Sequence, residues 1–108
     1  MPLEGGKQKV YAIAFDLDTQ VLADNYHNLS HNNAYNEIRV YLESKGFGHQ
    51  QGSVYFGDDT IDAVKTVLAV QGLTKKFPWF ASSVKDIQML RIEEHSNLLP
   101  AIRIPGDD

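Results

Sequence analysis

The stretch VYAIAFD, residues 10 to 16, decides the fold because it is a continuous apolar run that ends on a carboxylate. Uninterrupted β-branched and aromatic side chains are typical of a central strand that is buried on both faces. Before it, residues 1 to 8 combine proline and glycine with polar neighbours, which predicts a flexible amino-terminal tail. The domain is therefore expected to begin at residue 9, with this strand.

A helix is expected further along the chain, where apolar residues recur at helical spacing from Ala34 to Leu42. The polar segment from residue 18 to residue 33 is predicted to be a long connection, with Ser30 or Asn32 as the helix cap. A second helix is predicted after one of the capping residues 58 to 60. Its expected apolar stripe is Ile61, Val64, Val67 and Leu68, and its expected end is Gly72.

Three more strands complete the pattern. Residues 47 to 51 and 53 to 56 are predicted to form a hairpin, and residues 84 to 94 a last long strand after a short turn opened by Pro78. The order strand, helix, strand, strand, helix, strand predicts an α+β, ferredoxin-like βαββαβ fold. The predicted domain covers residues 9–97 and has a four-stranded antiparallel sheet with two helices on one face; a carboxyl-terminal extension follows over residues 98–108.

A sheet covered on one face leaves its other face uncovered, so we expect a homodimer. Tyr11, Tyr55 and Leu90 are expected to supply apolar side chains to that face. The apolar start of the extension, residues 98 to 104, is expected to add an edge strand to the partner.

Composition limits the class of protein. The chain has 108 residues, a net charge of −4 and no cysteine, which favours one compact domain and excludes a disulfide scaffold. The acidic balance argues against broad nonspecific adhesion to nucleic acid. No apolar run approaches the roughly 20 residues that cross a bilayer, and the amino end lacks the apolar centre of a signal peptide. A cytoplasmic protein without a membrane partner is expected.

Asp16 and Asp18 follow the first strand, and this D-x-D pattern is similar to the first motif of haloacid dehalogenase-like phosphatases. The later string FGDDTIDA, residues 56 to 63, is similar to their magnesium-binding acidic motif. However, 42 positions separate Asp16 from Asp58, which leaves no room for a doubly wound domain. Carboxylates that cap a helix explain the second string better, so a phosphatase-like fragment is the lesser alternative.

Four blocks, in order and with similar spacing, resemble the virulence-associated protein D (VapD) family, which is related in fold to the small nuclease-like subunit of CRISPR spacer acquisition. They are YAIAFDL (11 to 17), AYNEIRVYLESKGF (34 to 47), QGSVYF (51 to 56) and WFASSVKDIQMLRIEEHS (79 to 96). The tail and the extension have no counterpart in the family, and Gln88 stands where a basic residue is more usual.

The resemblance implies a small dimeric endoribonuclease, often encoded with an antitoxin as a toxin–antitoxin pair. Asp16 matches the family's acidic residue after the first strand and Ser53 its serine, so both are the expected catalytic residues. Asp16 is expected to act as a base, or to hold Mg²⁺ or another divalent cation with its twin across the dimer axis. Lys85 and Arg91 are the expected RNA-binding cations.

One geometric expectation opposes this assignment. The first and third strands of such a sheet are expected to run parallel, which would put Asp16 and Ser53 at opposite ends of one protomer. Only a two-chain site, or an early break in the first strand, would then bring them together. The predicted function is an RNA-cleaving homodimer, and its non-enzymatic alternative is a dimeric scaffold that binds a partner without turnover.

Overall fold

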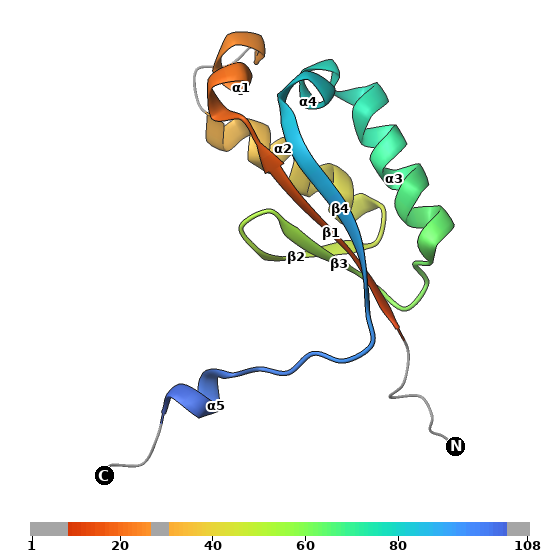
Figure 1. The fold of residues 1–108 in the computed structure, drawn as a ribbon. Helices are drawn as coiled ribbons and strands as arrows, with labels where there is room; N and C mark the ends of the chain where they lie inside the picture. The colour runs from red at the N-terminus through yellow and green to blue at the C-terminus, as the bar shows by residue number, and fades with distance from the viewer. Residues whose placement is uncertain (1–8, 27–30, 104–108) are drawn as a thin grey trace.

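A computed structural model describes residues 9–26 and 31–103 (Figure 1). The elements in chain order are β1 (Val10–Leu17), α1 (Thr19–Asn25), α2 (His31–Ser44), β2 (Phe47–Gln51), β3 (Val54–Gly57), α3 (Ala63–Lys76), α4 (Pro78–Ser83), β4 (Val84–Ile92) and α5 (Leu99–Ile102). The predicted tail, residues 1–8, and the predicted cap Ser30 lie outside the described residues. Asn32, the other predicted cap, lies inside α2.

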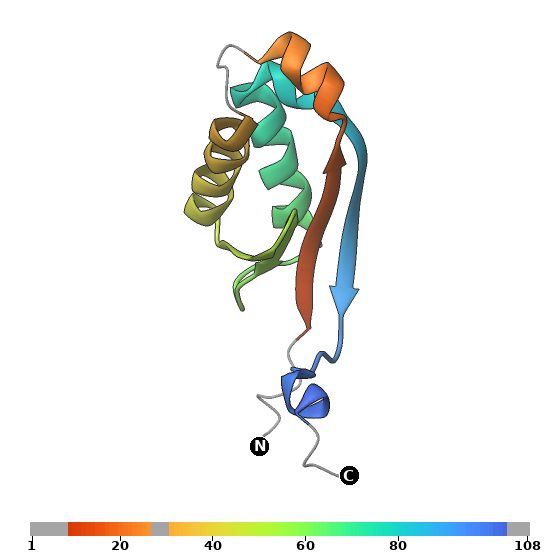
Figure 2. The ribbon, with the colours of Figure 1, turned by 90° about the vertical axis from the view of Figure 1, so that its left-hand side faces the viewer.

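The four strands form one sheet in the order β2-β3-β1-β4, and each neighbouring pair is antiparallel. α2 and α3 lie on one face of this sheet, as Figure 2 shows, so the predicted ferredoxin-like α+β fold is confirmed. The expectation that the first and third strands run parallel is wrong, because Ile13 pairs with Tyr55 in an antiparallel ladder. The β2–β3 hairpin reverses the chain once more, and β3 therefore enters the sheet beside β1 in the opposite direction.

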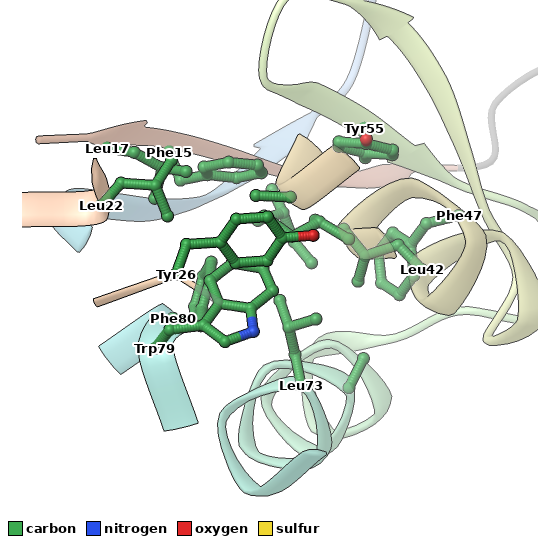
Figure 3. Packing of buried hydrophobic residues seen from close by; sticks show 14 of the residues in the cluster. Phe15, Leu17, Leu22, Tyr26, Leu42, Phe47, Tyr55, Leu73, Trp79 and Phe80 are labelled. Carbon is green, nitrogen blue, oxygen red and sulfur yellow. The ribbon is translucent and has the colours of Figure 1, made fainter. Parts of the chain in front are cut away.

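The predicted polar connection contains a helix, α1, that packs at one end of the sheet. The Asp18 carboxylate caps it by accepting hydrogen bonds from the backbone N–H groups of Gln20 and Val21. Leu22 of α1 is fully buried, and the ring of Tyr26 packs edge-on against Trp79 of α4 at 4.9 Å between centroids (Figure 3). α1 and α4 therefore close the core beyond the end of β1.

The Tyr26 hydroxyl donates a short hydrogen bond to the Glu37 carboxylate on α2. Burial raises the pKa of Tyr26 to about 12, and the hydrogen bond and charge of Glu37 contribute to the same shift. The protonated phenol is thus the form that joins α1 to α2.

Of the apolar stripe predicted for α3 only Ile61 is buried, and it lies before the helix begins. The buried residues of α3 are Thr66, Ala69 and Leu73. Val64 and Leu68 of the predicted stripe are instead more than half exposed. The helix begins after the cap Asp62, rather than after residues 58 to 60, and continues through Gly72. A Cβ at Gly72 would lie 2.0 Å from the Tyr41 hydroxyl of α2, so glycine permits a close contact between the helices here.

Of the three residues predicted for the uncovered face of the sheet, one lies there and two lie on the opposite face. Tyr11 and Tyr55 pack with the core on the helix side. Tyr55 is the register partner of the buried Ile13, and Tyr11 lies two positions before Ile13 on the same strand, so all three share one face. Leu90, 42% exposed, pairs with Ala12 on the uncovered face, as predicted. Phe56 pairs with the same alanine from the other side. An apolar strip therefore crosses this face.

The carboxyl-terminal extension differs from the predicted edge strand. Residues 99–102 form one helical turn, α5, which Figure 1 shows projecting away from the sheet. Pro100 at its start lacks the N–H that a strand ladder needs, which explains the difference. In the described part of the chain, no helix has the length and apolar character needed to cross a membrane.

Candidate active site

Asp16 lies near the end of β1, on the uncovered face of the sheet. Its neighbours Phe15 and Leu17 are buried on the helix side, so strand alternation turns the Asp16 side chain, 66% exposed, the other way. Across β4 its register partner is Asp86, and the ladder is irregular directly after this pair. β-Bulges of this kind often lie beside active sites, where they change the direction of a side chain.

Ser53 lies next to this point, in the turn directly before β3, the other strand that pairs with β1. The backbone N–H of Phe15 donates a hydrogen bond to the Ser53 carbonyl at 3.1 Å. Gly52 makes the preceding turn with a φ of +51°, a conformation that suits glycine. Because β1 and β3 are antiparallel, Asp16 and Ser53 lie at the same end of one protomer, which removes the geometric objection to their acting together.

The two side chains lie on different sides of the sheet. Ser53 is two positions before Tyr55 and lines a cavity on the helix side, together with Tyr35 and Arg39 of α2. Asp16 occupies the opposite side, but its charge acts across the end of the strand. Burial raises the pKa of Tyr35, and the Asp16 carboxylate raises it further. Asp16 and Ser53 therefore lie at the same end of the sheet but face opposite sides of it.

Lys85 is the cation beside Asp16. Its Nζ lies 3.8 Å from Asp16 Oδ2, and both side chains are more than half exposed. An exposed pair of this kind stabilises the fold by at most about 1 kcal/mol, so the ammonium group is free to turn towards a bound anion. Asp86, which the sequence analysis did not select, completes the cluster from β4.

Arg91 is not part of this cluster. Arg91 pairs with Tyr11, near the other end of β1. At about 3.3 Å per residue, Tyr11 and Asp16 are roughly 17 Å apart along the strand. The Arg91 guanidinium group lies 3.4 Å from the Glu93 carboxylate. The two predicted RNA-binding cations are therefore separated within one protomer.

Asp16 and Asp86 are the carboxylates that could hold a metal at this end of the sheet. Among residues 9–26 and 31–103, no group of three or more histidine, cysteine or acidic side chains is placed to bind an ion. Mg²⁺ usually needs only one or two protein carboxylates, with water and phosphate oxygens completing its six ligands. Asp16 and Asp86 match that number of carboxylates, and Asp86 Oδ1 also accepts a hydrogen bond from the Gln88 amide at 2.9 Å.

The second acidic string cannot form a phosphatase site with Asp16. Phe56 pairs with Ala12, so the residues after β3 lie at the opposite end of the sheet from Asp16. Hydrogen bonds from Thr60 lower the pKa of Asp58, which forms a local turn, and Asp62 caps α3. With Asp18 capping α1, these carboxylates stabilise helix and turn termini.

A ferredoxin-like sheet that gathers a carboxylate, a hydroxyl and an ammonium group at one end carries the groups that phosphodiester cleavage requires. No family model matches the chain. Individual relatives do match: Endoribonuclease VapD 2 of Riemerella anatipestifer is 54% identical over 93 residues, covering 86% of this chain and 99% of the relative. Endoribonuclease VapD homolog of Helicobacter pylori is 55% identical over 95 residues, covering 88% and 98%.

Endoribonuclease VapD of Dichelobacter nodosus is 37% identical over 94 residues, again covering 98% of that protein. The matched lengths leave only short parts of this chain unaligned. The chain belongs to the VapD family of endoribonucleases.

Proposed function

We propose that this protein cleaves RNA at a phosphodiester bond held over the end of β1. The observation that supports this most directly is that Asp16 of β1, Lys85 of β4 and Ser53, directly before β3, lie at one end of the sheet, in a chain whose relatives are named endoribonucleases. Purified protein incubated with a structured RNA should give discrete fragments on a gel. Binding without fragments would instead favour the dimeric scaffold.

In the proposed reaction Asp16 accepts the proton of the attacking oxygen, either an RNA 2′-hydroxyl or a water, as that oxygen bonds to phosphorus. The scissile P–O bond breaks, and its leaving oxygen takes a proton from solvent. The Lys85 ammonium, 3.8 Å from Asp16, stabilises the negative charge that develops on the phosphate. The Ser53 hydroxyl donates a hydrogen bond to a phosphate oxygen from the helix side of the strand. A cation held by Asp16 and Asp86 would supply further charge neutralisation at the phosphate.

RNA binding should distinguish the two predicted cations. We expect Lys85→Glu to weaken RNA binding about tenfold or more, because it reverses a charge beside the phosphate. Arg91→Glu at the other end of β4 should have a smaller effect.

Filter binding at several salt concentrations should show a shallow dependence of RNA affinity on salt, equivalent to about two to four phosphate contacts, because the net charge is −4. Equal losses for both variants would place the RNA along the whole of β4.

We also propose a homodimer formed through the uncovered face of the sheet. Leu90 and Phe56 flank Ala12 on this face, α2 and α3 lie on the other face, and the ring of His95 after β4 contacts Phe56 at 5.2 Å between centroids. Sedimentation should give about twice 12.1 kDa at micromolar concentration. Leu90→Asp should yield a folded monomer, because burying an unpaired charge in the interface is unfavourable.

Val64→Asp is the matched control for the dimer. Val64 is 66% exposed on α3, on the other side of the molecule, and its replacement should leave the mass unchanged. A dimer that survives Leu90→Asp and dissociates with Val64→Asp would move the interface to the helix layer.

The proposal extends to a cytoplasmic toxin that is neutralised by an antitoxin protein. Its support is the family resemblance, and RNA in the cytoplasm is the corresponding target. Expression of the chain alone should arrest growth of a bacterial host, and expression of the Asp16→Asn variant at the same level should not. Equal growth with both proteins would contradict the toxin assignment and leave RNA cleavage to be judged by the purified protein.

A further inference from the structure

The cavity beside Ser53 contributes only the Ser53 hydroxyl to the chemistry proposed at Asp16. It lies between α2 and the β2–β3 hairpin and has a volume of about 520 Å³, within the size range of small-ligand sites. Its lining includes Tyr35, Asn36, Arg39, His49, Ser53 and Tyr55. Aromatic rings, an amide and an arginine in one cavity favour a ligand that has both a flat ring and an anionic group.

The floor and rim of the cavity are held in place by contacts within the fold. Tyr55, 3% exposed, stacks with Phe15 of β1 at 6.1 Å between centroids and contacts the His49 ring at 5.0 Å. His49 Nε2 lies 2.7 Å from the Gly52 carbonyl, so the imidazole supports the turn that precedes Ser53. The aromatic surfaces are therefore positioned before a ligand enters.

The exposed groups provide polar recognition. Asn36 offers an amide that can both donate and accept hydrogen bonds, as the edge of a nucleobase requires. Arg39 pairs with Glu43 at 3.3 Å on the helix surface, and both side chains are about half exposed, so the guanidinium can turn to a phosphate at small cost. Aromatic faces, an amide and a guanidinium are the groups that bind unpaired RNA bases.

The position of the cavity links it to Asp16. Ser53 belongs to its lining, and the Ser53 carbonyl is hydrogen-bonded to Phe15, the residue before Asp16. An RNA strand that passes from one face of the sheet to the other beside Phe15 would place one phosphate at Asp16 and the neighbouring nucleotide in the cavity. We propose that this cavity binds one unpaired nucleotide next to the cleaved bond and sets the base preference of the enzyme; the inference rests on the proposed RNA cleavage.

Steady-state cleavage of short RNAs that differ only in the base beside the cut tests this assignment. Asn36→Ala and Arg39→Ala, both at exposed positions, should raise KM about tenfold and reduce discrimination between bases, with kcat changed by less than about threefold. Glu43→Gln is the control, because it removes the ion pair and keeps the guanidinium. Unchanged KM and base preference in both alanine variants, with cleavage intact, would overturn the inference and leave the proposed function standing.

Direct binding separates the cavity from the chemistry. The Asp16→Asn protein should bind a short single-stranded RNA, with NMR shifts at His49 and Tyr35 that Asn36→Ala weakens. Titration with free ribonucleoside monophosphates shows whether a lone nucleotide suffices or the RNA strand is required, and either result supports a nucleotide site. Binding of RNA without shifts at His49 and Tyr35 would place the nucleotide outside this cavity and overturn the inference. If the parent protein cuts no RNA but shows the shifts, the cavity binds a nucleotide, whereas the proposed function and the placement of that nucleotide beside a cleaved bond both fail.

Discussion

The Asp16→Asn variant should cleave RNA about a hundredfold to ten-thousandfold more slowly than the parent, because loss of a general base has an effect of this size. The substitution preserves the size of the side chain and removes its charge and basicity. Asp16 is 66% exposed and its ion pair with Lys85 is a surface contact, so folding should be almost unaffected. Initial rates with a labelled RNA, together with thermal melting and sedimentation, measure the two effects separately.

Asp18→Asn is the matched control, two positions along the same chain. Asp18 caps α1 through its carboxylate, and asparagine caps a helix about as well as aspartate does. Its variant should retain both stability and cleavage. A folded, dimeric Asp16→Asn protein that cuts RNA at the parent rate would contradict the assignment of Asp16, whereas loss of cleavage with Asp18→Asn alone would shift attention to α1.

The sequence was sufficient to predict the elements in which a strong local signal and burial agree. β1 is apolar on both faces, and it is the central strand that the run VYAIAFD indicates. α2 ends at Ser44, just before Gly46, whose φ of +97° suits the glycine that follows a helix. α4 begins at Pro78 as predicted, since proline is favoured in the first turn of a helix.

Elements whose packing depends on small or polar residues were predicted less well. α1 lies in a segment rich in asparagine and aspartate, and only its cap Asp18 and the pair Val21 and Leu22 indicate it. In α3 the large residues Val64 and Leu68 suggested the wrong buried face. Thr66 and Ala69 are buried instead, because small side chains allow the helix to approach its neighbours closely.

Some residues of the candidate site were predicted and others were not, because the site depends on how distant strands pair. Asp16 and Ser53 were selected through resemblance, and their proximity required the direction of β3, which was predicted incorrectly. Asp86 was missed because its relation to Asp16 is a register across two strands that are 70 positions apart in sequence. An acidic residue directly after Lys85 was the only local signal, and such residues are common on strand surfaces.

The pairing of Asp16 with Asp86 predicts a second large effect, a loss of cleavage when divalent metal is removed. Excess EDTA should slow cleavage about a hundredfold or more, and added Mg²⁺ should restore it. The physical reason is that Asp16 and Asp86, register partners on the uncovered face, would repel both each other and the RNA phosphate, and Lys85 offsets only one of these charges. Asp16 and Asp86 would hold the cation, and its positive charge would offset this repulsion.

Asp86→Asn then determines whether the pair or Asp16 alone holds the cation. If both carboxylates hold it, the Mg²⁺ concentration for half-maximal cleavage should rise about tenfold to a hundredfold, with the maximal rate largely regained at saturation. The matched variant Asp59→Asn, at the opposite end of the sheet, should leave the Mg²⁺ dependence unchanged. Full-rate cleavage in EDTA would overturn the metal proposal alone, because Asp16 could still act as a base beside the Lys85 ammonium, and the Asp16→Asn variant would then remain the test of the site.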